Sequence, residues 1–370
     1  MEQGVNLVGY ARAAMGLGES CRNAAASLEA VHVPFGILNY EQCLQEKNVI
    51  TWAHKEMDAP RYNCSMYHIN ADQMQYALLH YRKQELHAAG YNIGYWHWEL
   101  PKFPEEWRYA YAFIDELWVP SHFVKEACEP QTNIPIKVMP HAITAKIETP
   151  LSRTYFQLPE QRFLFLTMYD SLSHQARKNP LGVIEAFQAA FASDDKDVGL
   201  VVKVSRSQFD AEDIKRLHAL IAGYENIYLI EGFKTRDEIY NLIALCDCYA
   251  SFHRSEGFGL PIAEAMRFGR PVIATNWSGN TDFMTEETSC PLRYTLSTVK
   301  EDHGPYKKGQ IWAEPDLEHG AYCMKKVKDN RHYRETISKA ASQHILSNYH
   351  PQKIGELMKE RLVTLDLLQK

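Results

Sequence analysis

The sequence predicts an α/β protein built from two Rossmann-like domains. Its 370 residues are too many for one compact core, since single cores stop growing near about 250–300 residues. Apolar stretches alternate with helical patterns along most of the chain, as in parallel sheets with crossover helices. Residues 141–162 contain two prolines and no clear periodicity, and we interpret them as a linker.

These observations predict three parts. We expect an N-terminal Rossmann-like domain over residues 1–150 and a C-terminal Rossmann-like domain over residues 151–345. Residues 346–370 are expected to form a closing helix, with packing against the N-terminal domain as one option. The chain shows no internal repeat and no low-complexity tract.

The first block of alternating elements precedes the linker. We expect strands over residues 5–10, 34–40, 91–99 and 116–121, and helices over 18–31, 71–86 and 104–114. The strands are short apolar runs, and the helical stretches repeat apolar residues every three to four positions. This half is therefore predicted to hold one parallel sheet.

The second block has the same alternation. We expect strands over residues 163–170, 198–205, 226–232, 247–252 and 270–275, and helices over 179–193, 210–223, 235–246 and 261–268. After Thr275 the pattern loosens, and two helices follow over 333–349 and 351–368. A second parallel sheet is predicted.

Composition and charge exclude several classes. A net charge of −6 without a basic block argues against nucleic acid as the main partner, because binding to phosphate backbones needs clustered Lys and Arg. The first residues lack the pattern of a secretory leader, and no apolar run approaches the roughly 20 residues that span a bilayer. The eight scattered cysteines predict reduced thiols in the cytoplasm, with Cys246 and Cys248 structural.

The stretch "SFHRSEGFGLPIAEAMRFGRPVIAT", residues 251–275, carries two glutamates eight positions apart, Glu256 and Glu264. Its pattern predicts a strand-to-helix turn at the carboxyl end of a strand, where open α/β sheets bind ligands. Glycines let a ligand approach the backbone, and amides at a helix N-terminus suit a diphosphate. The turn residues with this expected role are Gly257, Phe258, Gly259 and Leu260.

A carboxylate beside a phosphate is repulsive unless hydroxyl groups are its partner. We therefore expect Glu256 to bind the hydroxyls of a sugar and Glu264 those of a ribose, in a nucleotide-sugar. In "SHQARKNPLGVIEAF", Arg177 and Lys178 precede a helix that begins near Pro180. Two cations at a helix N-terminus are suited to hold the diphosphate.

The segment "HRSEGFGLPIAEAMRFGRPVIAT" resembles the paired-glutamate motif of retaining glycosyltransferases of the GT-B fold, particularly glycosyltransferase family 4. "SGNTDFM" and "GQIWAEPD" are similar to a bacterial subgroup with mannosyl- and rhamnosyl-transferases of surface polysaccharide synthesis. The resemblance covers the second half of the chain well and the first half only in short pieces. It implies two Rossmann-like domains facing a central cleft, with residues 1–150 on the acceptor side, residues 151–345 binding the nucleotide-sugar donor, and C-terminal helices closing the structure. Relatives carry an arginine several residues before the lysine, where this chain has Asp170 or its neighbours.

The resemblance implies a hexosyltransferase that moves a mannose- or rhamnose-like sugar from a nucleotide-diphosphate donor to a glycan or a lipid-linked acceptor. The acceptor hydroxyl is expected to attack from the face that the diphosphate leaves, with retention and without a metal or other cofactor. Lys178, Arg177 and the amides after Glu256 would stabilise the departing diphosphate. A cytoplasmic location is expected, with peripheral contact at the inner membrane face left open.

Further candidate residues come from other loops. Phe233 follows a strand and is a candidate to stack on the nucleobase, and Lys203 is a weaker one. Gly16 and Gly18 lie in a loop that receives phosphate if the resemblance extends to this half. A dinucleotide site with Glu41 as the ribose ligand is a weak alternative, since the third glycine of the usual motif is missing.

"YWHWELP" ends a strand, so His97, Trp98 and Glu99 are expected to face the cleft. His97 or Glu99 is expected near the reacting centre, and the two stay undistinguished; packing of this aromatic cluster is the competing interpretation. His141 is expected to be structural. Residues 194–197, "DDKD", are expected to be a solvated loop and not a metal site.

Two other classes remain open. A sugar-nucleotide epimerase shares the two-Rossmann architecture and would isomerise the sugar without an acceptor. A non-catalytic GT-B subunit that supports a partner enzyme is disfavoured because Glu256, Glu264 and Lys178 are all present.

Overall fold

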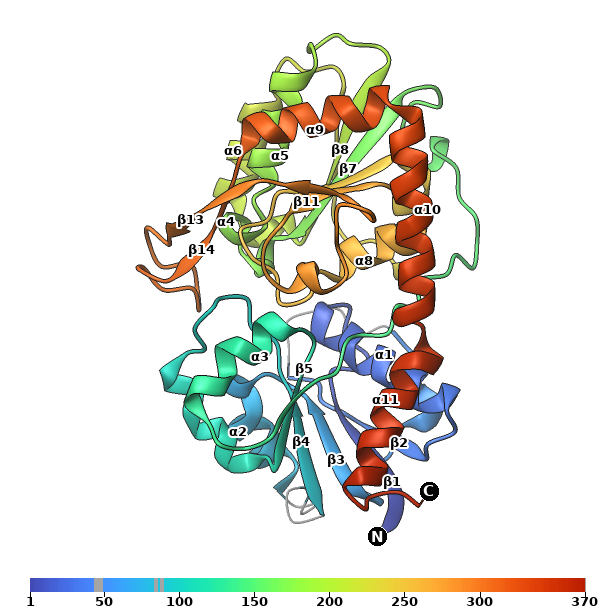
Figure 1. Cartoon of the computed structure of the whole chain (residues 1–370), viewed down its shortest axis with the longest axis vertical. Helices are drawn as coiled ribbons and strands as arrows, with labels where there is room; N and C mark the ends of the chain where they lie inside the picture. The colour runs from blue at the N-terminus through green and yellow to red at the C-terminus, as the bar shows by residue number, and fades with distance from the viewer. Residues whose placement is uncertain (43–48, 83–85, 87–89, 370) are drawn as a thin grey trace. The chain divides into compact units, whose positions relative to one another are not determined.

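The computed structural model describes residues 1–42, 49–82, 86 and 90–369, and the chain divides into two compact units (Figure 1). Unit 1 comprises Met1–Thr144 with Ser347–Lys370, and unit 2 comprises Ala145–Leu346. The predicted boundaries were 150/151 and 345/346, whereas unit 2 begins at Ala145 and ends at Leu346. Each unit has its own hydrophobic core.

Unit 1 is built on a parallel sheet with strand order β2-β1-β3-β4-β5-β6. Its strands are β1 Glu2–Gly9, β2 Phe35–Asn39, β3 Tyr62–His68, β4 Tyr91–Tyr95, β5 Glu116–Val119 and β6 Ile136–Val138. Its α-helices are α1 Gly16–Ala30, α2 Ala71–His80, α3 His122–Cys128 and α11 Pro351–Thr364, and the helix predicted over 104–114 is the 3₁₀ helix η4 Glu105–Phe113. The helix expected over 71–86 ends at His80, and part of the remainder lies outside the described residues.

The C-terminal helix α11 packs against α1 in unit 1. Its buried residues are Ile354, Gly355, Met358 and Leu362. A side chain at Gly355 would place Cβ 2.2 Å from the Ser27 carbonyl oxygen, so glycine is required where the two helices approach. Arg361 forms an ion pair with the fully buried Glu116 of β5, and Trp118 Nε1 donates to the same carboxylate. These contacts join the end of the chain to the first sheet.

Unit 2 contains the second parallel sheet, with strand order β12-β11-β10-β7-β8-β9. Its strands are β7 Phe163–Asp170, β8 Val198–Ser205, β9 Ile227–Glu231, β10 Cys248–Ser251, β11 Val272–Thr275 and β12 Cys290–Leu292. Its helices are α4 Gln175–Lys178, α5 Pro180–Ala190, α6 Ala211–Ile221, α7 Arg236–Leu245, α8 Leu260–Arg267, α9 Leu317–Asp329 and α10 Arg331–Asn348. β7 and β8 match the predicted strands residue for residue.

The order of the second sheet positions a ligand site. β7 is the first strand of this sheet in the chain, and it lies between β8 and β10. The connections therefore leave β7 and β10 in opposite directions, which creates a topological switch point at their carboxyl ends. Open α/β sheets bind ligands at such points. The segment with Arg177 and Lys178 follows β7. Residues 252–259, which we call the Glu256 loop, follow β10.

A separate two-stranded antiparallel hairpin extends from unit 2. It consists of β13 Tyr294–Thr298 and β14 Ile311–Pro315, which pair from Tyr294–Pro315 to Thr298–Ile311.

The seven described cysteines are buried and free, including Cys246 and Cys248, whereas Cys43 lies outside the described residues. Among the helices of the described ranges, none is both long enough and apolar enough to cross a bilayer.

Candidate functional site

The Glu256 loop connects β10 to α8 at the switch point of unit 2. Gly259 has φ +95° and is the N-cap of α8, a conformation that favours glycine, and Pro261 lies in the first turn of the helix. Leu260 opens the helix, whereas the Phe258 side chain is buried against Phe283, with ring centroids 5.0 Å apart. The strand-turn-helix predicted from the sequence is therefore present, and Phe258 supports the turn from inside.

The Glu256 carboxylate is buried between two cations. Lys178 Nζ lies 2.5 Å from Oε1, and Arg177 Nη1 lies 3.2 Å from Oε2. Burial alone would raise the pKa of Glu256, but the positive charges of Lys178 and then Arg177 outweigh it and lower the pKa to about 2. The carboxylate is thus ionised at neutral pH. The structure brings together the three residues that the sequence placed in one site.

The loop after β11 holds the Glu256 backbone. The Glu256 N–H donates to Ser278 Oγ at 2.8 Å, and the Gly279 N–H donates to the Glu256 carbonyl at 2.9 Å. A Cβ on Gly279 would lie 2.1 Å from the Gly257 carbonyl oxygen, so the two loops touch at a position that needs glycine. Sequence reasoning missed Ser278 and Gly279 as site residues, although both belong to the "SGNTDFM" segment that it singled out.

His253 lies three residues before Glu256 and is fully buried. Its Nδ1 is 3.0 Å from Ser251 Oγ and its Nε2 is 3.0 Å from Asn280 Oδ1. Burial lowers the pKa of His253 to about 4, so the ring is neutral at pH 7 and can accept at one nitrogen and donate at the other. His253 therefore links the strand end before Glu256 to the loop after β11.

Lys178 and Arg177 lie on the short helix α4 after β7. Asn179 follows in the left-handed region at φ 50°, where its Oδ1 accepts from the Gly182 N–H and its Nδ2 donates to the Phe252 carbonyl at 2.9 Å. The Arg177 side chain is almost fully buried, and its Nη1 donates to the Ser255 carbonyl at 2.8 Å. Lys178 is more exposed, with 17% of its side chain accessible. Lys178 is thus the cation of this pair that solvent reaches.

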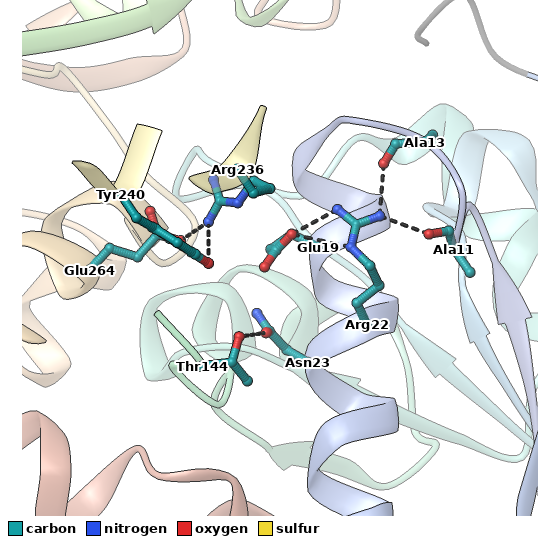
Figure 2. Close-up of polar contacts among 9 residues, drawn as sticks. All are labelled: Ala11, Ala13, Glu19, Arg22, Asn23, Thr144, Arg236, Tyr240 and Glu264. Atoms are coloured by element: carbon teal, nitrogen blue, oxygen red, sulfur yellow. Dashed lines mark hydrogen bonds and ion pairs between the residues drawn. The ribbon is translucent and has the colours of Figure 1, made fainter. Parts of the chain in front are cut away.

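Glu264 lies in α8 and is 3% exposed. It forms an ion pair with Arg236 from the start of α7, whose guanidinium lies over the Tyr240 ring, 4.6 Å from the centroid (Figure 2). Arg236 Nη2 also donates to Tyr240 Oη at 2.9 Å. Sequence reasoning missed Arg236, because only the packing of α7 beside α8 brings it to Glu264.

The remaining candidates of this unit are Lys203, which lies in β8, and Phe233, which lies in the loop after β9. Phe233 is 40% exposed and follows Gly232, which has φ +89°. Lys203 is buried, and its Nζ donates to the Gly232 carbonyl at 3.1 Å, so it supports the turn before Phe233. Arg206 Nε donates to Asp170 Oδ1 at 3.0 Å. Relatives were expected to carry an arginine near the position of Asp170 in sequence; in this chain Arg206, the first residue after β8, reaches Asp170 instead.

In unit 1, the loop of residues 10–15 leads from β1 to α1, and Gly16 and Gly18 lie in the first turn of α1 instead of in the loop predicted from the sequence. Gly18 is closely packed: a Cβ there would lie 2.2 Å from the Ala13 carbonyl oxygen, whereas a Cβ at Gly16 would meet none of the described residues beyond its own helix turn within 4 Å. Arg22 Nη1 donates to the carbonyls of Ala11 and Ala13, at 2.8 and 2.9 Å (Figure 2). The loop is therefore held by Arg22, which sequence reasoning missed. A phosphate role for Gly16 and Gly18 stays a prediction.

The segment after β4 only partly matches the expectation. Trp98 is 1% exposed and its Nε1 donates to the Lys102 carbonyl at 2.8 Å, so Trp98 belongs to the interior of unit 1, contrary to the prediction that it faces a cleft. Its indole packs edge-on against Trp107. His97 and Glu99, on either side of it, are half-buried.

His97 belongs to a hydrogen-bonded chain that fixes its tautomer. Tyr95 Oη donates to the Met139 carbonyl at 2.5 Å, so the same oxygen accepts from His141 Nδ1 at 3.3 Å. Burial lowers the pKa of His97 to about 4 and that of His141 well below its usual value, so both rings are neutral. His141 Nε2 then accepts from His97 Nε2–H at 2.9 Å, which leaves His97 Nδ1 as an acceptor. His141, expected to be structural, sets the proton position on His97.

Within the described ranges, no group of three or more His, Cys, Asp or Glu is arranged to hold a metal ion. The absence of a metal requirement stays a prediction.

Residues 156–289 match the family model described as "Glycosyl transferases group 1". Over 121 residues the chain is 29% identical to the serotype-specific mannosyltransferase WbdA of Escherichia coli, which corresponds to 33% of this chain and 14% of that protein. The chain thus spans a small part of the length of this curated relative. Residues 156–289, which match the family model, include Lys178, Glu256 and Glu264.

Solved structures match over nearly the whole chain. HepE of Anabaena, in complex with UDP and glucose, has a TM-score of 0.67 at 15% identity and covers 98% of this chain and 100% of its own. Sucrose-phosphate synthase from Thermosynechococcus elongatus has a TM-score of 0.71 at 14% identity and covers 99% of both chains. A glycosyltransferase from Rickettsia africae reaches 0.69 at 16% identity over 100% of both chains. These likenesses confirm the predicted GT-B fold of two Rossmann-like domains.

Proposed function

We propose that the chain is a retaining, metal-independent glycosyltransferase that moves a hexose or deoxyhexose from a nucleotide-diphosphate sugar to a glycan or lipid-linked acceptor in surface polysaccharide synthesis. The observation that carries this proposal is the Lys178–Glu256–Arg177 cluster at the switch point of a sheet within the matched family region. The UDP and glucose bound to HepE and the mannosyltransferase name of WbdA support the substrate class. Action in the cytoplasm, with peripheral contact at the inner membrane face, belongs to the same proposal.

The cluster has the charges that this reaction needs. Lys178 is close to solvent and neutralises the diphosphate as the bond from the sugar C1 to the phosphate oxygen breaks. The ionised Glu256 accepts hydrogen bonds from hydroxyls of the sugar. The acceptor oxygen forms the new bond to C1 on the same face, and its proton passes to an oxygen of the departing diphosphate.

Other residues orient the donor in this proposal. Glu264 binds the ribose hydroxyls, with Arg236 beside it to balance its charge. Phe233 is exposed beside the Gly232 turn and stacks on the base. His97 or Glu99 of the N-terminal domain is the residue expected near the reacting centre, and the two stay undistinguished.

A binding and transfer panel tests the proposal. GDP-, UDP-, dTDP- and ADP-sugars are added singly to the protein, and the shift in Tm and the transfer of labelled sugar to glycan acceptors are measured. A donor at about 100 times its Kd stabilises the protein by roughly 2.7 kcal/mol. We expect one base to give this shift and transfer to follow with the same base.

Two charge variants serve as matched controls. Lys178→Gln should abolish the shift, whereas Lys196→Gln, which removes an exposed lysine paired with Glu225, should keep it. No shift and no transfer with any donor would contradict the proposal. An isomerised sugar formed without an acceptor would identify an epimerase instead.

A further inference from the structure

The β13–β14 hairpin contacts both segments that carry the charged cluster. Its connecting residues 299–310 place Gly304 and Tyr306 against α4, and its second strand lies along the loop before Glu256. Nothing in the proposed reaction assigns a role to this hairpin. A cavity of about 450 Å³ lies beside the hairpin, and its lining includes Asp210, Asp213 and Arg216 as well as Ser297, Lys300 and Trp312.

The first contact is aromatic. The Tyr306 ring is 4% exposed and faces the Arg177 guanidinium, whose Cζ lies 5.6 Å from the ring centroid. The His174 ring packs edge-on against the same tyrosine, with centroids 5.5 Å apart. A Cβ on Gly304, which has φ +56°, would lie 2.4 Å from His174 Cε1. The hairpin tip is therefore closely fitted to α4.

The second contact is polar and joins the hairpin to Arg254 in the Glu256 loop. Glu314 binds Arg254 through two hydrogen bonds of 2.7 Å, and the Ala313 N–H donates to the Arg254 carbonyl at 3.0 Å. The Arg254 guanidinium lies over the Trp312 ring, 5.3 Å from the centroid. The Arg254 N–H in turn donates to the Arg177 carbonyl at 2.7 Å. Arg254 thus connects the hairpin, α4 and the Glu256 loop.

We propose that Tyr306 is a positioning residue for the reaction inferred above: it holds the Arg177 guanidinium in the orientation that binds Glu256 Oε2 and the Ser255 carbonyl. The proposal rests on the proposed function only for its effect on activity. A guanidinium held over an aromatic face loses orientational freedom, and a buried carboxylate needs its partners fixed. Tyr306 acts through Arg177 and does not touch the donor.

The activity test is a double-mutant cycle on sugar transfer. Tyr306→Leu should lower kcat/KM about tenfold, and Tyr306→Phe, which keeps the ring face, should retain at least half of it. In an Arg177→Lys background, Tyr306→Leu should lower kcat/KM by less than a further twofold, because the variant has no guanidinium for the ring to orient. Leu296→Ala, on the exposed face of β13, should leave kcat/KM unchanged.

A loss of the same size in both backgrounds would show a general structural role and overturn the proposal.

A second readout does not depend on transfer. The arginine Nε–H signals are recorded in a ¹⁵N–¹H spectrum of the full chain, and the signal of Arg177 is identified by its absence in Arg177→Lys. Tyr306→Leu should shift this signal and speed its exchange with water at least fivefold, and Tyr306→Phe should not. An unchanged signal in Tyr306→Leu would overturn the positioning role even if the protein transfers sugar; a changed signal in a protein that transfers none would support it and refute the proposed function.

Discussion

Glu256 is a buried carboxylate whose charge depends on its neighbours. Lys178 and Arg177 bind its two oxygens, and Ser278 fixes its backbone. Removing one member of a buried ion pair typically costs about 3–5 kcal/mol, because the remaining charge is left buried and uncompensated. The same arrangement that could bind a sugar diphosphate therefore contributes to the stability of unit 2.

The lowered pKa of Glu256 predicts a pH-dependent stability. The folded pKa of about 2 lies below the ordinary value of 4.5, so the contribution is complete above pH 4.5 and is lost as the pH falls toward 2. The difference in free energy of unfolding between wild type and Glu256→Gln should shrink by about 2 kcal/mol from pH 6 to pH 3. Urea unfolding at several pH values measures it.

The control for this titration is Glu225→Gln, which removes an exposed carboxylate 2.7 Å from Lys196. Solvent screens this pair, so its difference from wild type should change far less over the same pH range. A difference for Glu256→Gln that stays constant with pH would show that Glu256 titrates normally in the folded protein.

For single residues, the sequence predicts the roles that depend on a local motif, and it does not predict contacts between separate helices. Glu256, Gly259 and Lys178 follow from a strand-turn-helix pattern and from cations before a helix. Arg236 beside Glu264 could not be predicted, because it depends on how α7 and α8 pack. For Trp98 the sequence left two interpretations open, a position facing the cleft after the end of a strand and packing in an aromatic cluster; the structure shows packing, because Trp107 and the Lys102 carbonyl hold the indole inside.

Among the elements, the contact between α1 and α11 depends most visibly on one residue. Gly355 faces the Ser27 carbonyl, where a Cβ would lie at 2.2 Å. Gly355→Val should therefore force the helices apart and lower the free energy of unfolding by about 1–3 kcal/mol or more. Calorimetry of the full chain should show a lower Tm.

Gly16→Ala is the matched comparison for stability, because a Cβ at Gly16, in the first turn of α1, meets none of the described residues beyond its own helix turn within 4 Å. It should leave Tm unchanged or slightly raised, as alanine restricts the unfolded chain. Equal Tm values for Gly355→Val and wild type would mean that the helices do not pack as closely as described.

Elements were predictable where their apolar pattern was continuous. β7 and β8 are almost uninterrupted apolar runs, and both were placed correctly. β3 was missed because Asn63 and Ser65 interrupt its pattern, although Ser65 is buried and accepts from Asn6 Nδ2 at 3.2 Å. The β13–β14 hairpin was missed because its residues are partly exposed: Leu296, at its centre, is 60% exposed.

For the whole molecule, the alternation of strands and helices was sufficient to predict two Rossmann-like domains, and the solved structures confirm this fold. The switch point could not be derived from alternation, because strand order is a property of the sheet. Only the order β10-β7-β8 shows that the segments after β7 and β10 meet. The paired glutamates and the basic pair had suggested this independently.

The central claim is that this switch point binds the diphosphate of a nucleotide-sugar through Lys178. A crystal structure of the full chain with the nucleoside diphosphate that gives the largest thermal shift tests it most directly. We predict phosphate oxygens within hydrogen-bonding distance of Lys178 Nζ, with the ribose hydroxyls on Glu264. A diphosphate bound elsewhere, with the Lys178–Glu256 pair undisturbed and remote from it, would contradict the account.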